Sequence, residues 1–322
     1  MSQGNRPVAY GGQAVIEGVM FAGRTVNVTA VRKKDRTIDF LETPRVEKQW
    51  VRALKRVPLL RGIIALVEAS AKGSQHLNFS AESYAEEEGD TKQPEKERKS
   101  LTDSLTMIFG VAVVGVLSFI FGKLVFTLVP AVLEELLFGT AFDSTVGHNL
   151  IEGAIKLVFL VTYIQLIAMT PLIKRLFQYH GAEHKVITAY EAGDPLTVEH
   201  VQKYNTLHYR CGSSFIILTV IVGIFLYSFF EWNSLWERIT IRIALLPLVI
   251  GLSYEVLRFT NIVRDIPLLR YLGYPGLWLQ KLTTKEPTDD QVEVAIASFN
   301  RMLEADLRNT THAKESSSAV GA

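Results

Sequence analysis

Long runs of hydrophobic residues dominate the pattern of this chain from residue 105 onward. Four such runs cover residues 105–129, 150–170, 214–230 and 241–257. A run of about 20 apolar residues is the length that an α-helix needs to cross the hydrocarbon core of a bilayer. Lys123 and Lys156 interrupt two of the runs near one end, where a long side chain can extend to the interface. The pattern therefore predicts a mainly α fold with four transmembrane helices.

The first 80 residues have shorter periods that are typical of a soluble α+β portion. Apolar and polar residues alternate through 26–30, and the alternation resumes at 38–40 after a polar turn. Alternation with period two on both sides of a turn predicts a β-hairpin within residues 8–43. Residues 46–79 have apolar positions at helical spacing, which predicts an amphipathic helix.

Differences in composition divide the chain into five parts. They are a soluble α+β N-terminal portion (1–80), a linker (81–104), a membrane region (105–257) with a cytoplasmic loop (171–213), an interfacial segment with a C-terminal helix (258–310), and a disordered tail (311–322). The linker has almost no large apolar side chains, so burial cannot offset the entropy lost on ordering. Tyr271, Tyr274 and Trp278 are of the kind expected along a membrane interface. Thr288 and Gln291 fit a capping box that opens the last helix.

Lysine and arginine are distributed unevenly between the flanks of the predicted spans. The segment before the first span, the 171–213 loop and the tail after the fourth span are rich in them. Residues 130–149 contain none, and residues 231–240 contain only Arg238. An excess of lysine and arginine marks the cytoplasmic side of a membrane protein. We therefore expect a multi-pass protein of the cell membrane with both termini in the cytoplasm.

Composition and charge exclude two classes of protein. The formal net charge is +1, so the whole chain has no attraction for nucleic acid, and we expect membrane lipids rather than nucleic acid as partners. Cys211 is the single cysteine, which excludes an intramolecular disulfide framework. The first twenty residues lack the basic segment and apolar core of a secretory signal, so we expect the N-terminus to stay where it is made.

The 171–213 loop concentrates side chains that can bind a metal ion. It contains four of the seven histidines and the single cysteine. On a helix His180 and His184 lie one turn apart on one face, which is the spacing that two imidazoles need to reach one ion. Glu183 completes an H-x-x-E-H pattern, in which a glutamate beside two zinc-binding histidines polarises water. Three further residues are candidates for completing the ligand set, namely Glu191, His208 and Cys211.

A second interpretation of the same loop needs no metal. Histidines near a membrane interface can form hydrogen bonds with lipid head groups or loop carbonyls. Cys211 can be a small buried hydrophobic residue at the start of a span. The spacing alone leaves both interpretations open.

A glycine-bracketed segment at residues 11–20 is the second candidate for a site. Its glycines permit positive φ angles and a close approach of the backbone to other groups. Glu17 and Arg24 could line a polar site there. A strand with tight turns and a solvent-facing glutamate is the simpler interpretation.

Five sequence blocks, spread over nearly the whole chain, identify a relationship. They are residues 11–20, 179–185, 208–215, 275–280 and 283–287. With these blocks the chain resembles the YqhQ family (domain of unknown function 1385), bacterial membrane proteins that are described as metal-dependent enzymes of unknown function. The resemblance implies that the motif histidines, Cys211 and Glu17 belong to one metal site, and it implies no substrate. Residues 21–23 depart from the relatives, which tend to have methionine and arginine there, and this argues against Arg24 as a site residue.

The leading hypothesis is a metal-dependent enzyme at the cytoplasmic face of the membrane. A divalent metal, with zinc as the first choice, would be held by His180, His184 and at least one of the three further candidates. Glu183 or Glu17 would act as general base. Hydrolysis is the expected reaction because zinc activates water near neutral pH. The substrate could be a lipid, a lipid-linked precursor or a peptide.

A different hypothesis is a non-enzymatic membrane scaffold or regulator in which the metal is a structural clamp. A closed site with four protein ligands is typical of structural zinc, whereas three ligands and an open position are typical of catalysis. A transporter is disfavoured because the predicted spans contain no ionisable residues near their centres.

Overall fold

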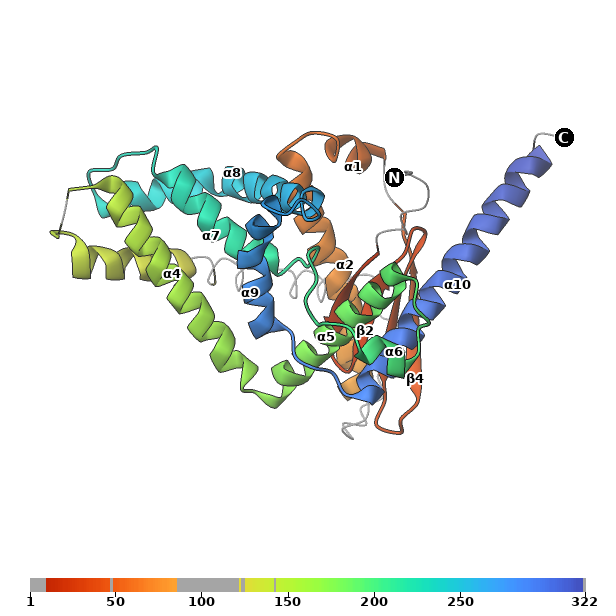
Figure 1. Cartoon of the computed structure of the whole chain (residues 1–322). Helices are drawn as coiled ribbons and strands as arrows, with labels where there is room; N and C mark the ends of the chain where they lie inside the picture. Colours follow the sequence, from red (N-terminus) through yellow and green to blue (C-terminus); the bar gives the residue numbers. More distant parts are fainter. Residues whose placement is uncertain (1–9, 47–48, 86–121, 123–124, 142, 321–322) are drawn as a thin grey trace, which may run out of the picture. The chain divides into compact units, whose positions relative to one another are not determined.

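The structure is a computed structural model of the chain (Figure 1), and it describes residues 10–46, 49–85, 122, 125–141 and 143–320. Two compact units emerge from the contacts between residues. Unit 1 comprises Met1–Glu88, Ile164–Leu218 and Ile250–Ala322, and unit 2 comprises Gly89–Tyr163 and Thr219–Val249. The described residues are mainly helical with a small antiparallel sheet near the N-terminus, as the pattern predicts.

The sheet belongs to unit 1 and has four antiparallel strands in sequential order. They are β1 (Gly11–Val15), β2 (Gly18–Ala22), β3 (Val26–Arg32) and β4 (Ile38–Pro44). The predicted hairpin is the β3–β4 pair, in which Arg32 lies opposite Ile38. Its polar turn is closed by hydrogen bonds from the Lys33 amide to the Thr37 carbonyl (2.9 Å) and from the Arg36 amide to the Lys33 carbonyl (3.0 Å).

Two helices distant in sequence cover one face of this sheet. Unit 1 contains the helices α1 (Gln49–Leu54), α2 (Leu60–Ala85), α5 (Pro171–Ala192), α6 (Val198–Gln202), η2 (Leu269–Gly273), α9 (Tyr274–Thr283) and α10 (Asp289–Val320). Helices α5 and α10 pack on the sheet and on each other. The core between them is aromatic, since Phe299 of α10 meets Tyr10 and Phe21 edge to face, with ring centroids 5.4 and 4.9 Å apart. Alternating residues of the strands supply the apolar face that these helices bury.

A buried histidine of α2 reaches the opposite face of the sheet. His76 is fully buried, and its ring is hydrogen-bonded to the hydroxyls of Thr29 (2.6 Å) and Thr43 (3.2 Å). Thr29 alternates with Val28 and Ala30 along β3, so it points away from the aromatic core. Burial lowers the pKa of His76, which favours a neutral ring.

This burial predicts a loss of stability in mild acid. Because the folded pKa of His76 is lowered, the unfolded chain binds the proton first as the pH falls below the ordinary histidine value of about 6.5. The folded state should therefore lose stability from about pH 7 toward the lower folded pKa. We expect His76→Gln to flatten the decrease in melting temperature between about pH 7.5 and about pH 5.5. Thermal unfolding of the full chain in detergent measures this decrease in melting temperature. His200→Gln, at a partly exposed histidine, is the control, and an equally steep decrease in all three proteins would contradict the prediction.

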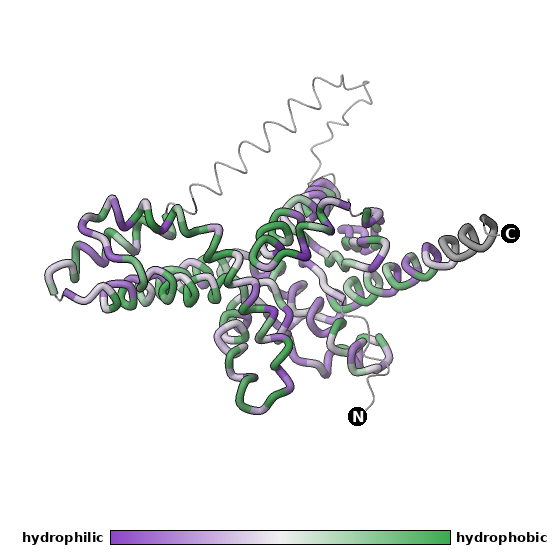
Figure 2. Tube along the Cα trace, turned by 90° about the horizontal axis from the view of Figure 1, so that it is seen from above, coloured by the Kyte–Doolittle hydropathy of each residue, from purple (hydrophilic) through white to green (hydrophobic). Residues whose placement is uncertain are grey.

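Two helices of the described chain are long and apolar enough to cross a membrane, judged by length and composition. They are α4 (Thr145–Ala168), which covers all but the last two residues of the second predicted span, and α8 (Leu235–Ile262), which contains the fourth. Figure 2 shows that hydrophobic positions predominate along them. The third predicted span corresponds to the shorter apolar helix α7 (Ser214–Tyr227), and most of the first, 105–129, lies outside the described residues.

Unit 2 buries a cluster of opposite charges among these apolar helices. Arg238 has no exposed surface and is paired with Glu134 (2.6 Å) and Glu152 (2.7 Å). Arg242 is also paired with Glu152 and is buried, instead of extending to an interface. The Trp232 ring lies 4.7 Å from the Arg238 guanidinium. Buried charges of this kind are tolerated because each has an opposite partner, and removal of one partner would leave the other uncompensated.

Candidate metal centre

Helix α5 carries the H-x-x-E-H pattern and has clear start and stop signals. Pro171 occupies its first turn, where a missing N–H costs nothing, and Gly193 ends it in the left-handed conformation (φ 81°). Within the helix His180 and His184 lie on one face, and their ring centroids are 4.5 Å apart. The helical spacing alone therefore brings the two imidazoles together.

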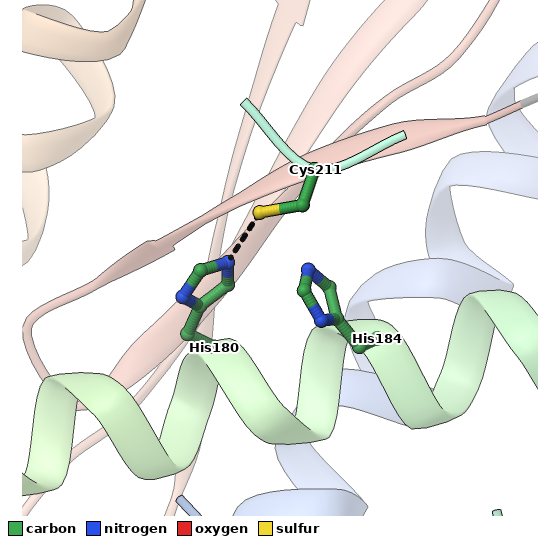
Figure 3. A group of neighbouring side chains, drawn as sticks. All are labelled: His180, His184 and Cys211. Carbon is green, nitrogen blue, oxygen red and sulfur yellow. Dashed lines mark hydrogen bonds between the residues drawn. The ribbon is translucent and has the colours of Figure 1, made fainter. Parts of the chain in front are cut away.

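The turn that precedes α7 brings Cys211 to the same point. Its Sγ atom is 3.2 Å from Nε2 of His180, and Figure 3 shows the thiol facing the two rings that project from α5. One ligand atom from each of the three residues lies within 4.8 Å of the others. Cys211 is buried, as is His184.

A glutamine of α9 holds this turn in place. The Gln280 side chain accepts from the His208 amide (2.8 Å) and donates to the His208 carbonyl (2.8 Å) and to the Ser214 hydroxyl (2.9 Å). Gln280 itself is fully buried. Its amide thus holds the backbone of His208 before Cys211 and the side chain of Ser214 after it.

Two backbone carbonyls set the tautomers of the histidines. Nδ1 of His180 is 2.9 Å from the carbonyl of Thr283, and Nδ1 of His184 is 2.5 Å from that of Thr206. A carbonyl only accepts, so each ring carries its proton on Nδ1 and has a lone pair on Nε2. Burial also lowers the pKa of His184, which favours the neutral ring. Such outer hydrogen bonds are the usual way in which a protein orients metal-binding histidines.

These donors fit a zinc ion. Around a tetrahedral zinc with bonds of roughly 2.0 to 2.3 Å, the ligand atoms lie about 3.3 to 3.8 Å apart. The observed separations, from 3.2 Å up to at most 4.8 Å, need only a small closing movement of one side chain. Two imidazole nitrogens and a thiolate are also the donor types that zinc prefers. Three protein donors leave one position of the tetrahedron open.

Glu183 faces a cavity beside these donors. The cavity has a volume of about 330 Å³, and its lining includes His180, Glu183, His184 and Cys211. Burial raises the pKa of Glu183 to about 7, against the opposing effects of the His180 ring and the Gly12 amide. A carboxyl with this pKa can both take up and release a proton near neutral pH.

Two glycines permit the close packing around α5. A Cβ atom on Gly12 would lie 2.7 Å from the Met20 carbonyl oxygen and 3.0 Å from Cγ of Glu183. A Cβ atom on Gly181 would lie 2.1 Å from the Lys285 carbonyl oxygen, so only glycine lets the segment after α9 lie against α5. The Thr283 carbonyl at the end of α9, two residues before Lys285, orients His180.

The other predicted site residues lie outside this group of donors. Glu17 is in the β1–β2 turn (φ 51°), and both of its oxygens accept from Arg175 at 2.5 Å. Arg24 donates its backbone amide to Asp306 (2.7 Å). Neither Glu17 nor Arg24 lines the cavity.

Glu191 and His208 form a second layer. Glu191 is paired with Arg210, and its oxygen is 3.8 Å from Nε2 of His208. Burial by itself would raise the pKa of Glu191, but His208 and Arg210 outweigh it and lower the pKa to about 2. The His208 ring is 5.6 Å from that of His184, lines the cavity, and has a buried Nε2 without a hydrogen-bond partner among the described residues.

Several contributors to the site had no role in the sequence prediction. Gln280 and Thr283 lie in blocks that the resemblance covers, but nothing in their spacing marks them as supports of histidines. Thr206 acts through its carbonyl, which every residue has, so no side-chain pattern could identify it.

Comparison with known proteins connects the chain to a family without an established activity. The family described as "Protein of unknown function (DUF1385)" matches residues 57–305. An uncharacterised protein, YqhQ of Bacillus subtilis (strain 168), is 52% identical over 320 residues, which cover 99% of this chain and 100% of the relative. No solved structure matches the chain.

The geometry predicts one divalent ion for each chain. We expect elemental analysis of the detergent-purified protein to find zinc close to one equivalent, and His184→Ala and Cys211→Ser to lower the metal content severalfold because each removes one of three donors. His200→Ala, at a histidine outside the group, should keep the wild-type content. Substoichiometric metal in the wild type that neither substitution changes would contradict the prediction.

Proposed function

The chain belongs to the DUF1385 family, and we propose that it is a metal-dependent hydrolase acting at the cytoplasmic face of a bacterial membrane. One observation carries the proposal: three oriented donors with an open fourth position adjoin a buried carboxyl and a cavity. This combination is typical of catalytic rather than structural zinc. The residues assigned to the metal are His180, His184 and Cys211.

A divalent ion at this position would act as a Lewis acid and lower the pKa of water toward neutrality. Glu183 is the general base: its buried carboxyl accepts a proton from the attacking water and later donates it to the leaving group. The carbonyls of Thr206 and Thr283 keep both Nε2 atoms directed at one point. The apolar burial of Glu183 keeps its proton affinity matched to neutral pH.

The proposal includes a multi-pass arrangement with four spans and both termini in the cytoplasm. Helices α4 and α8 support two of the spans by length and composition. The apolar α7 and the run at 105–129 are the basis for the other two. The distribution of lysine and arginine supports the orientation, which assigns the 171–213 loop to the cytoplasmic side. The substrate would then be a membrane lipid, a lipid-linked precursor or a peptide that reaches this surface.

A structural clamp is the second candidate, and one residue favours it. His208 has a buried Nε2 without a hydrogen-bond partner among the described residues, and its ring is 5.6 Å from that of His184. A modest rotation would make it a fourth ligand and close the site. The metal content of His208→Ala distinguishes the clamp from the hydrolase. A large loss of metal is expected for the clamp, in which His208 would be the fourth ligand, and no loss is expected for the hydrolase, in which three residues hold the metal.

Glu183→Gln tests the catalytic assignment. We expect this variant to keep its metal and to lose about 10²- to 10⁴-fold in hydrolytic rate, because the amide cannot accept the proton. The measurement is the zinc-dependent hydrolysis of p-nitrophenyl acetate, supported by mass spectrometry of products formed from a bacterial membrane extract. Glu199→Gln, at an exposed glutamate of α6, is the matched control. Equal rates for wild type and Glu183→Gln would contradict the assignment.

A further inference from the structure

One edge of the sheet borders the candidate metal centre. Strand β1 pairs with β2 on one side and, among the described residues, is the end strand of the sheet. The cavity that contains His180, Glu183 and Cys211 is also lined by Gly11, Gly12, Gln13 and Ala14, which are most of β1. An end strand has backbone donors and acceptors that its own sheet does not use.

The register shows which backbone groups of β1 face away from β2. The amide of Arg32 donates to the Glu17 carbonyl (2.8 Å), so odd-numbered residues of β2 hydrogen-bond to β3 and even-numbered ones to β1. Gly18 therefore forms the hydrogen-bonded pair with Val15, and the next such pairs are Met20 with Gln13 and Ala22 with Gly11. The N–H and C=O groups of Gly12 and Ala14 consequently point outward.

Two outward amides near the cavity already have partners. The Ile16 amide donates to the Ser80 hydroxyl (3.2 Å), and the Gly12 amide faces the Glu183 carboxyl. Between them, no hydrogen bond from the Ala14 backbone to another described segment is present on the outer side. Ala14 thus offers one donor and one acceptor in strand geometry, and the Gly12 carbonyl adds a second acceptor.

We propose that the substrate of the hydrolase is an extended peptide, which adds as a strand to the outer edge of β1 by pairing with Ala14. This inference rests on the proposed function. An extended backbone carries donors and acceptors at the spacing that a β-edge requires, and pockets then receive alternate side chains. Leu176, Phe177 and Ile187 line the same cavity and provide apolar contacts for such side chains.

The reaction that follows is hydrolysis of a peptide bond beside the three donors. Water oxygen bonds to the carbonyl carbon, the C–N bond breaks, and Glu183 transfers a water proton to the leaving nitrogen. The second water proton also ends on the nitrogen, so the products are a carboxylate and a protonated amine. No oxidant, reductant or further co-reactant is needed.

The charges around the cavity favour a peptide over a phosphate-bearing lipid. Arg210 is the one arginine or lysine among the lining residues, and it is paired with Glu191. Arg175 precedes the lining residue Leu176 in the sequence, and it is paired with Glu17. Apart from the metal ion itself, a phosphate would meet no unpaired arginine or lysine among the described lining residues, whereas a neutral peptide backbone needs no such cation.

The test removes the outward donor of β1. Ala14→Pro deletes this N–H, which an end strand tolerates because the missing group faces away from its sheet. The probes are a quenched fluorescent decapeptide library and p-nitrophenyl acetate, used with zinc-loaded full-length protein. We expect peptide cleavage to slow about fivefold to tenfold relative to ester hydrolysis, with the metal retained. Ala14→Ser keeps the N–H and should therefore recover most of the peptide cleavage that Ala14→Pro loses.

A binding measurement on the catalytically inactive variant Glu183→Gln separates the inference of a peptide substrate from the proposed hydrolase function. Glu183→Gln should bind a fluorescein-labelled decapeptide library, and fully N-methylated decapeptides should fail to compete because they cannot donate to Ala14 or Gly12. This readout does not depend on folding of the proline variant. Ester hydrolysis without peptide cleavage or binding would overturn the peptide inference and leave the hydrolase standing. Peptide binding with no hydrolysis of either probe would overturn the hydrolase and leave strand addition standing.

Discussion

The close approach of strand β1 to helix α5 at Gly12 is the constraint on which the site depends. Because Gly12 has no side chain, the β1 backbone lies against Glu183 and encloses it. This enclosure has two consequences. It raises the pKa of the carboxyl to about 7, and it makes strand β1 one wall of the cavity that contains the histidines. A side chain at this position would separate the strand from the helix.

Several distant segments must be in place before the three donors can meet. The helix contributes His180 and His184, the turn before α7 contributes Cys211, and α9 holds that turn through Gln280. Gly181 allows the Thr283 carbonyl to approach, and that carbonyl orients His180. The donors are therefore oriented by parts of unit 1 that are separated by about a hundred residues of sequence. Pre-orientation of this kind lowers the cost of binding an ion, since the ligands need little reorganisation.

Pairing distinguishes the three carboxylates that the sequence named as candidates for the site. Glu17 and Glu191 each have an arginine partner, and at Glu191 the neighbouring His208 and Arg210 lower the pKa, which favours the charged form and makes this carboxylate a poor proton acceptor near neutral pH. Glu183 has no such partner among the described residues and is buried, so it retains the affinity for a proton that a general base needs. The same principle acts in unit 2, where Arg238 and Arg242 can be buried because Glu134 and Glu152 neutralise them.

The sequence by itself determined the features that depend on local periodicity. Helical spacing placed His180 and His184 on one face, alternation identified the β3–β4 hairpin, and the apolar runs marked α4 and α8 as helices able to cross a membrane. The composition of the 171–213 loop also identified Cys211 as a neighbour of the histidines, because few other residues there can bind a metal.

Only the tertiary structure decided which carboxylate faces the cavity and which edge of the sheet lies beside it. These outcomes depend on contacts between β1, α5 and α9, and no local pattern records a contact between segments so far apart. Backbone carbonyls such as those of Thr206 and Thr283 leave no trace in the side-chain pattern at all. For the same reason the sequence could identify the glycine-bracketed segment as a place of close backbone approach, but it could not identify the residue. In the structure this residue is Gly12, and Glu17 has no part in the approach.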